Sequence, residues 1–308
     1  MLKEIVKNDN LSWNKNILLE EDYSFSLSKS VIYEISDNKM KIEEWNVGFE
    51  NPPEIKSLRL ISSEINNSYI LSGLGFVLIK GLDCFSDNII RKTFYLLNYY
   101  LGKPLKQNIN GDLFVDVKNR GKSMKTGGRY HQTSEGGSLH TDSPQWENAP
   151  DLIGLLCLKE AKKGGESILL SAYNIHNEYL TKNSSSLSTL YEDFHFDKRG
   201  EYVKGEPSTT IKPIFSYENN ELRFRYLRDY IDGAKVEDNL SLNEERVEAL
   251  DLLDEILENK ENSLRFFIKS SEILFFNNHR IIHGRTSFTD FEDESLRRLM
   301  VRSWTSTN

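Results

Sequence analysis

The chain has 308 residues and a net charge of −8, and hydrophobic residues make up 38% of it, with 11% aromatics. This apolar content suffices for a sizeable core and argues against wholesale disorder, while the acidic balance argues against a nucleic-acid partner. Only two cysteines occur, Cys84 and Cys157, which predicts that no disulfide framework holds the fold. We find no signal-peptide pattern and no stretch near the ~18 apolar residues of a membrane span. We therefore expect a cytoplasmic protein without a membrane partner.

The first third of the chain predicts a mixed lead-in followed by one strand and one helix. Residues 1–70 mix polar and apolar positions without a clean period, and we expect mixed α/β structure there. A short apolar run at 76–79, flanked by glycines, predicts a buried strand. Residues 89–101 have apolar side chains at helical spacing and end before a glycine, which predicts a helix.

The remaining elements are strands around one clear helix. Residues 152–158 and 167–170 are strand candidates separated by a turn at 162–165. A helix is predicted over 241–260, because Ser241 and Glu244 form a capping box ahead of one apolar stripe. The C-terminal part returns to predicted strands at 273–276, 280–283 and 298–304.

These elements predict one domain with a mostly β fold. The sequence has no internal repeat and no Pro- or Gly-rich linker. Short strands on both sides of a helical middle, without regular βαβ alternation, disfavour a doubly wound sheet. They fit a double-sheet jelly roll over residues 71–304 that carries a helical insertion at about 174–262.

A histidine followed two residues later by an acidic residue occurs three times, at His140, His176 and His195. About one such pair is expected by chance, so context has to decide among them. We expect His176 near the start of a surface helix, where the glutamate two places on faces away from it. We expect His195 at a partly buried strand end, so neither pair is favoured as a metal site.

The pair His140 and Asp142 lies where a strand end enters a loop, and on an extended chain both side chains project to the same side. His283, in a predicted strand that ends in glycine, is the best placed third ligand. His279 would lie about 13 Å away along a strand and cannot serve the same metal. Two histidines and one carboxylate suit non-haem iron(II), although three protein ligands also suit zinc.

The residues around these ligands resemble a known family. Ser138-Leu-His-Thr-Asp-Ser143, followed by the segments 154–158 and 164–167, resembles the taurine dioxygenase (TauD/TfdA) family of 2-oxoglutarate-dependent oxygenases. So does the C-terminal segment 277–286 followed by 297–304. The likeness runs in consistent order from about residue 70 to 304. It implies a double-stranded β-helix of the clavaminate synthase-like type.

The resemblance also implies the chemistry. The protein would be an Fe(II)- and 2-oxoglutarate-dependent dioxygenase that uses O₂ to oxidise, and typically to hydroxylate, an unactivated C–H bond with release of succinate and CO₂. His140, Asp142 and His283 would bind the iron, and the presence of Asp142 disfavours halogenation. The substrate would be a small, anionic or amino-acid-like metabolite. Desaturation, cyclisation and a homo-oligomer stay open, as do two alternatives: a jelly-roll binding protein without turnover and a zinc-dependent hydrolase.

Three further side chains would bind the co-substrate. Arg298, the first arginine of the pattern R-x-x-x-R-x-W, would pair with the far carboxylate of 2-oxoglutarate, a task that suits a planar guanidinium. Ser167 would assist where the family usually has threonine. Arg302 has the same strand parity as Arg298 and would approach the co-substrate or an anionic substrate. Arg297 is expected to be solvated or to pair with the acidic loop 292–294.

A basic stretch at residues 117–134 contains no acidic residue. We hypothesise a mobile loop that attracts 2-oxoglutarate or an acidic substrate, although a merely solvated loop explains the composition equally well. Its basic residues and glycines are Lys118, Arg120, Gly121, Lys122, Lys125, Gly127, Gly128 and Arg129. Asn108, Thr133 and the segment 223–230 are candidates to line the substrate site.

Overall fold

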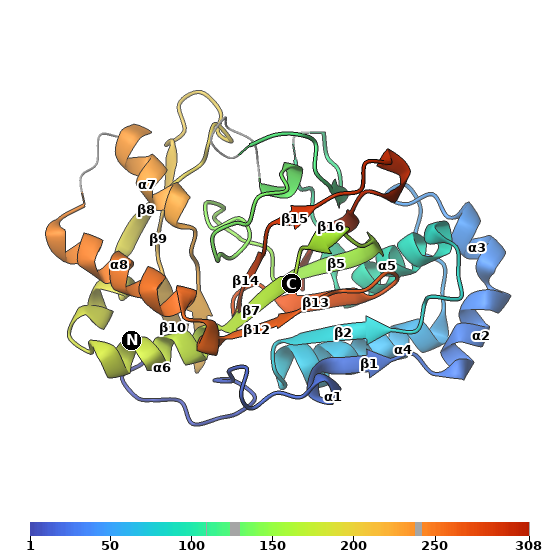
Figure 1. Cartoon of the computed structure of the whole chain (residues 1–308), viewed down its shortest axis with the longest axis horizontal. Coiled ribbons are helices and arrows are strands. Elements are labelled where there is room, and N and C mark those ends of the chain that lie inside the picture. The colour runs from blue at the N-terminus through green and yellow to red at the C-terminus, as the bar shows by residue number, and fades with distance from the viewer. Residues whose placement is uncertain (109, 124–129, 238–241, 308) are drawn as a thin grey trace.

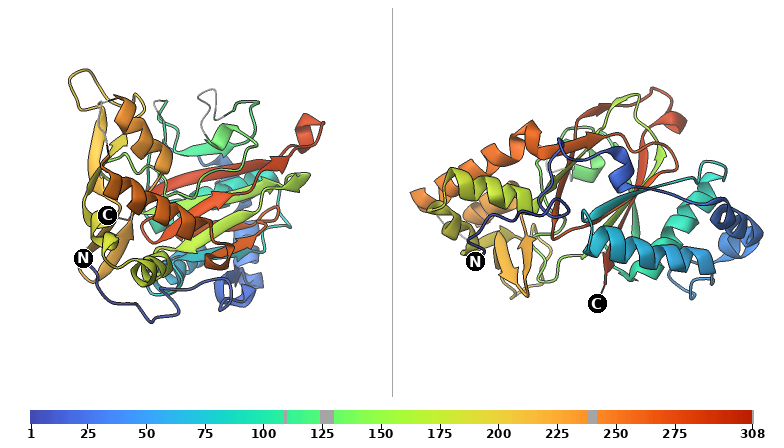
Figure 2. Two further views of the ribbon diagram at one scale, coloured as in Figure 1. Left: turned by 60° about the vertical axis from the view of Figure 1, so that its left-hand side comes forward. Right: turned by 90° about the horizontal axis from the view of Figure 1, so that it is seen from below.

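The computed structural model describes residues 1–108, 110–123, 130–237 and 242–307 (Figure 1). In this part of the chain a large and a small β-sheet pack against each other. One group of helices lies beside the large sheet and another beside the small sheet, so that the strands are flanked by helices at both ends of the molecule (Figures 1 and 2).

The large sheet has seven strands in the order β1-β2-β13-β5-β16-β3, with β4 paired to β16. Its neighbours pair antiparallel, except that β1 and β2 are parallel. The strands are β1 (Ser24–Ser26), β2 (Phe76–Lys80), β3 (Lys103–Pro104), β4 (Phe114–Val117), β5 (Leu152–Lys159), β13 (Ile273–Asn277) and β16 (Leu299–Ser306).

The small sheet has three antiparallel strands in the order β12-β7-β14. β6, which precedes β7 in the chain, pairs with β15, which follows β14. An isolated antiparallel bridge joins His140 to His283 in β14. The strands are β6 (Lys163–Gly164), β7 (Ser167–Ser171), β12 (Ser263–Phe266), β14 (Ile281–Arg285) and β15 (Phe288–Thr289).

Alternating side chains divide the core into layers. In β2, Phe76 and Leu78 belong to the apolar cluster shared by the two sheets, whereas Val77 and Ile79 belong to the cluster that includes the helices beside the large sheet. Successive side chains of a strand point to opposite faces, and both faces here are covered, which explains the continuous apolar runs. In β14, Ile281 belongs to the cluster between the sheets. His283, two residues further along the strand, therefore faces the same space between the sheets.

Helices cover both outer faces. Those beside the large sheet are α1 (Glu20–Tyr23), α2 (Lys29–Asp37), α3 (Lys39–Glu44), α4 (Lys56–Glu64), the π-helix η1 (Ile65–Leu71) and α5 (Asp87–Leu101). Those in the segment between β7 and β12 are α6 (Ala172–Lys182), η4 (Ser186–Tyr191), α7 (Arg228–Glu237), α8 (Glu244–Glu258) and η5 (Lys260–Asn262). Two further single turns are η3 (Tyr130–Gln132) and η6 (Glu294–Leu296).

The segment between β7 and β12 also contains two β-hairpins, of which the sequence predicted only a strand end at His195. They are β8 (Asp193–Asp197) with β9 (Thr209–Pro213), and β10 (Phe215–Glu218) with β11 (Glu221–Phe224). In the described part of the chain no helix is long and apolar enough to span a bilayer.

Most of the predicted elements are present. The strands expected at 76–79, 152–158, 167–170 and 273–276 correspond to β2, β5, β7 and β13, and the helix expected at 89–101 corresponds to α5. The turn expected at 162–165 contains β6.

Two local predictions were wrong. The helix predicted from Ser241 begins at Glu244, because the side chain of Asn243 accepts a hydrogen bond from the Arg246 amide and caps the helix there. Ser241 itself lies outside the described residues. His176 does lie in a helix, α6, but it is fully buried rather than on the surface. Its Nε2 lies 3.0 Å from the Tyr191 hydroxyl.

Candidate functional site

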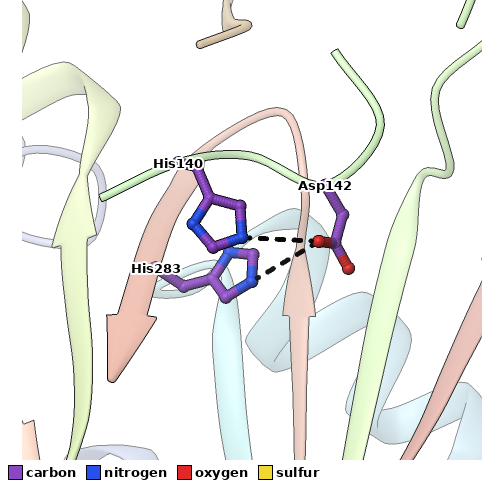
Figure 3. Close-up of side chains that lie close together, drawn as sticks. All are labelled: His140, Asp142 and His283. Carbon is purple, nitrogen blue, oxygen red and sulfur yellow. Dashed lines mark ion pairs between the residues drawn. The ribbon is translucent and has the colours of Figure 1, made fainter. Parts of the chain in front are cut away.

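The structure brings His140, Asp142 and His283 together between the two sheets (Figure 3). The backbones of His140 and His283 exchange two hydrogen bonds, of 3.0 and 2.9 Å, which sets their ring centroids 4.3 Å apart. Oδ1 of Asp142 lies 3.5 Å from Nε2 of His140 and 3.9 Å from Nε2 of His283. One possible ligand atom from each residue lies within 4.8 Å of the other two, so a single ion can reach all three.

Both imidazoles turn a nitrogen toward Asp142. Nδ1 of His140 lies 2.8 Å from the carbonyl oxygen of Ser138, so an Nδ1–H donates there and Nε2 is the nitrogen that faces the carboxylate. Burial, together with the neighbouring His140, lowers the pKa of His283 to about 3. His283 is therefore neutral at neutral pH, and only a neutral imidazole binds a metal.

Asp142 is held on all sides. The side chain of Asn278 bonds to both its backbone groups, accepting from the amide at 2.8 Å and donating to the carbonyl at 3.0 Å. Oδ2 of the carboxylate accepts hydrogen bonds from Trp304 Nε1 at 2.7 Å and from Arg302 Nη1 at 3.4 Å. Burial alone would raise the pKa of Asp142, but the charge of Arg302 and the hydrogen bond with His140 outweigh it and hold that pKa well below its usual range. The carboxylate is therefore ionised.

The chain turns sharply directly after this carboxylate. Ser143 has a φ of 53°, in the left-handed region that non-glycine residues rarely adopt, and a proline follows it. Such a conformation costs roughly 1–3 kcal/mol and persists only where the surroundings enforce it. Here the hydrogen bonds of Asn278 to Asp142 supply that constraint.

Two imidazole nitrogens and one carboxylate oxygen on one side of an ion form the donor set typical of mononuclear non-haem iron(II), which leaves further positions open. Nδ1 of His283 is buried without a hydrogen-bond partner among the described residues. The residues present therefore fit a divalent metal with N and O ligands.

A cavity of about 870 Å³ opens beside His140 and Asp142. Its wall includes Trp146 and Tyr130, whose ring lies edge-on to His140 with centroids 5.7 Å apart. The cavity also carries charged side chains of both signs. These are the cations Lys106, Arg199 and Arg302 and the anions Glu201, Glu206 and Asp229, besides Asp142. A small molecule with both a positive and a negative group could find partners here.

Arg298 and Ser167 line a second cavity, of about 330 Å³. Arg298 is 7% exposed, and its Nη1 has no hydrogen-bond partner among the described residues. Its guanidinium lies 5.0 Å from the ring centroid of Phe288, and burial, with the nearby Arg285, lowers its pKa to about 10. A buried cation with an unused N–H group has the chemistry to accept an anion such as a carboxylate.

The three arginines around β16 separate into three environments. Arg298 and Arg302 flank Met300, which belongs with Trp304 to the core between the sheets, so both lie toward this face as their parity predicted. Arg302 lines the larger cavity and Arg298 the smaller one. Arg297 is partly exposed and donates to Glu294 at 2.9 Å, which confirms the prediction that it pairs with the acidic loop.

The other histidines of the sequence analysis lie elsewhere. His279 occupies the turn between β13 and β14, where its Nε2 lies 3.0 Å from Asp151, outside the three-residue metal group. His195 lies within β8, half-buried, with Nδ1 3.0 Å from the Thr209 hydroxyl.

The predicted lining residues are present only in part. Asn108 lines the larger cavity, as do Leu227, Asp229 and Tyr230 of the segment 223–230, whereas Thr133 and the rest of that segment do not. In the basic stretch Lys118, Arg120 and Lys122 are exposed and do not line it. Lys125, Gly127, Gly128 and Arg129 lie outside the described residues.

Sequence reasoning assigned no role to Trp304, Gln107 or Asn278, although all three contact the site. Gln107 Oε1 accepts from Arg302 Nε at 2.9 Å. Trp304 could have been found, because it follows Arg302 by two residues and so shares its face of the strand. Gln107 and Asn278 lie in loops, and the sequence carries no periodic signal for them.

Residues 60–304 match the family model described as “Taurine catabolism dioxygenase TauD, TfdA family”. FR-33289 synthase of Streptomyces rubellomurinus is 28% identical over 275 residues, which cover 87% of this chain and 78% of that protein. The taurine hydroxylase-like protein SAT17 of Stachybotrys chartarum is 26% identical over 321 residues, covering 96% of this chain and 78% of that protein.

Solved structures share the fold. Asparagine oxygenase in complex with Fe(II), a hydroxyasparagine and succinate has a TM-score of 0.73 at 17% identity, over 92% of this chain and 94% of that one. The non-haem iron oxygenase OrfP in complex with Fe and alpha-ketoglutaric acid has a TM-score of 0.66 at 14% identity, over 92% and 94%. These likenesses confirm the predicted jelly-roll class.

Proposed function

This chain belongs to the TauD, TfdA family of Fe(II)- and 2-oxoglutarate-dependent oxygenases, and on that premise we propose that it hydroxylates an unactivated C–H bond of a small, amino-acid-like metabolite. The observation that carries the proposal is the meeting of His140, Asp142 and His283 at the wall of a cavity lined by charges of both signs.

Fe(II) would be held by Nε2 of His140, one oxygen of Asp142 and an imidazole nitrogen of His283. The hydrogen bond from His140 Nδ1 to Ser138 fixes the orientation of that ring, and burial keeps His283 neutral. With iron and 2-oxoglutarate bound, the reaction consumes O₂, converts 2-oxoglutarate to succinate and CO₂, and changes a substrate C–H bond to C–OH.

Arg298 and Ser167 would bind the distal carboxylate of 2-oxoglutarate. Ser167 lies opposite Arg285 in the β7–β14 ladder, two positions from the pair formed by Leu169 and His283. The anion site is thus about 7 Å along the sheet from the metal-binding histidine, a span that a five-carbon diacid can bridge. The unused Nη1 of Arg298 supports this assignment.

The substrate would lie in the larger cavity, close to Arg302. A zwitterionic amino acid or a derivative fits a lining that offers both carboxylates and cationic side chains. The structural neighbours point the same way, since asparagine oxygenase was crystallised with hydroxyasparagine and OrfP with (3S)-hydroxy-L-Arg. The side chains of this chain would orient the substrate and limit the access of water, and Trp304 and Trp146 close one wall.

The test is turnover. Iron-loaded protein with 2-oxoglutarate and O₂ is offered a panel of amino acids and their derivatives, and succinate formation is measured together with O₂ uptake. We expect one compound to accelerate succinate formation and O₂ uptake, with one succinate formed for each O₂ consumed, and to gain one oxygen atom itself. The His140→Ala variant serves as the blank.

Slow succinate release without substrate is also expected. If the iron-loaded protein forms no succinate under any condition, a binding protein without turnover explains the structure better. If zinc alone supports hydrolysis of a panel compound, the alternative of a zinc hydrolase replaces the proposal.

A further inference from the structure

We propose that Trp304, together with Arg302 and Gln107, keeps Asp142 bound to the metal through one oxygen only. This inference rests on the proposed function, because it assumes that Asp142 is a metal ligand. It assigns positioning roles to Trp304 and Gln107, which contact the carboxylate or its partner and not the reacting atoms.

The two oxygens of Asp142 have different surroundings. Oδ1 faces the imidazoles, 3.5 Å from His140 Nε2 and 3.9 Å from His283 Nε2. Oδ2 accepts the N–H of Trp304 at 2.7 Å and that of Arg302 at 3.4 Å. A carboxylate can bind a metal through one or both oxygens, and hydrogen bonds to one oxygen favour binding through the other alone.

The Trp304 donor is fixed in place. Trp304 is 6% exposed and belongs to the core between the sheets. Its ring packs edge-on against Trp146 with centroids 5.0 Å apart, and the guanidinium of Arg302 lies 4.5 Å from its ring centroid. The indole has a single N–H to donate, and in this position it is directed at the carboxylate.

The Arg302 donor is fixed by Gln107. Gln107 is 4% exposed and accepts the Nε–H of Arg302 at 2.9 Å. Its own amide nitrogen donates to the carbonyl oxygens of Leu113 and Arg302, both at 2.9 Å. Because every polar atom of the Gln107 side chain is used, rotation of this amide would break several hydrogen bonds at once.

The consequence concerns the number of open positions. Three single-atom protein ligands leave three positions of a six-coordinate ion free. A carboxylate that used both oxygens would take one of these, and 2-oxoglutarate and O₂ would then compete for the remaining two. Holding Oδ2 in hydrogen bonds therefore preserves room for both co-substrates.

The test uses Co(II) as a probe under anaerobic conditions, so that no turnover is needed. Trp304→Phe removes the N–H but keeps an aromatic ring, and Gln107→Leu removes the support of Arg302 from a different part of the chain. Trp45→Phe is the matched control, because Trp45 lies in the core on the other side of the large sheet and its Nε1 donates to the carbonyl oxygen of Glu50 at 3.2 Å.

We expect Trp304→Phe to bind Co(II) roughly 10- to 100-fold more weakly than the natural protein, the range typical for loss of a partner of a metal ligand. Its visible Co(II) spectrum should change in intensity and position, because the coordination changes. Gln107→Leu should shift the affinity and the spectrum in the same direction by less, and Trp45→Phe should shift neither.

Each other outcome has a defined meaning. If Trp304→Phe and Gln107→Leu both have the Co(II) affinity and the spectrum of the natural protein, the inference is overturned while the proposed function stands. Weaker binding with an unchanged spectrum also overturns it, because Trp304 would then only stabilise the loop. Failure of the proposed function is separate: the natural protein would bind no Co(II), or His140→Ala would bind it equally well.

Discussion

Replacement of Arg298 by methionine should change co-substrate binding and stability in opposite directions. Arg298 is 7% exposed and its Nη1 has no partner among the described residues. In the absence of 2-oxoglutarate the Nη1 group of this cation is buried without an acceptor among the described residues, and burial outweighs the attraction of the nearby Asp290. Methionine places an apolar side chain of similar length there. The natural residue is thus expected to favour binding at the expense of stability.

The magnitude follows from the pKa of Arg298, about 10 against an ordinary 12.5. That difference corresponds to about 3 kcal/mol by which folding disfavours the charged form. The penalty is complete below pH 10 and decreases as the pH rises from about 10 toward 12.5, so it acts fully at neutral pH. Methionine removes it but also loses the contact with Phe288, which leaves a gain of about 1–2 kcal/mol in the free energy of unfolding.

The loss of binding should be larger. Removal of one partner from a buried, hydrogen-bonded charge pair costs roughly 2–5 kcal/mol, so the dissociation constant for 2-oxoglutarate should rise by about 30-fold or more. The assays are urea unfolding of the protein without 2-oxoglutarate and titration of the iron-loaded protein with 2-oxoglutarate. Arg297→Met is the control, since the exposed Arg297 pairs with Glu294 and should affect neither quantity. The reasoning is refuted if Arg298→Met binds 2-oxoglutarate as tightly as the natural protein, or if it is clearly less stable.

Two further predictions concern residues that support the site. Asn278→Ala leaves backbone groups of Asp142 and Pro150 unpaired. It should therefore lower the free energy of unfolding by about 1–3 kcal/mol and weaken metal binding by roughly 10-fold or more. Unchanged metal affinity at reduced stability would contradict the predicted effect on metal binding. Asp151→Asn should destabilise the protein by about 1–3 kcal/mol near pH 6, measured by urea unfolding. Burial raises the pKa of Asp151, but hydrogen bonds from His279 and Thr307 outweigh it and lower that pKa to about 2. The stabilisation is therefore present above the ordinary carboxyl pKa and should disappear as the pH falls to about 2; a difference independent of pH would contradict it.

The strands and the metal group could be predicted because the signals are local. Residues 76–79 and 273–276 are apolar throughout, since helices cover one face of the large sheet and the small sheet covers the other. The parity of an extended chain places His140 and Asp142 on one side, and the structure agrees. Arg297 and Glu294 are three residues apart, which is close enough for their pairing to be expected.

What could not be predicted depends on contacts between distant segments. The hydrogen bond from Trp304 to Asp142 joins residues 162 positions apart, and the strand parity of Trp304 predicts its face but not this partner. Arg298 and Arg302 line separate cavities, and strand parity, which places both on one face, does not show this division. His176 is buried because Tyr191 and Phe215 pack on its ring, which the polar sequence around it does not indicate.

The start of α8 shows a different limit, since two good capping residues compete. Ser241 and Asn243 both favour the position before a helix, and the sequence alone ranked the capping box of Ser241 first. The structure uses Asn243. A difference of two residues at a helix end is the usual uncertainty of such predictions and does not affect the site.

The most direct test of the account is an anaerobic titration with Fe(II) and 2-oxoglutarate. The account predicts a visible charge-transfer band that saturates at one iron per chain, absent when zinc replaces iron and lost in the His283→Ala variant. A band of full intensity in His283→Ala, or none in the natural protein, would show that His140, Asp142 and His283 do not jointly hold the iron.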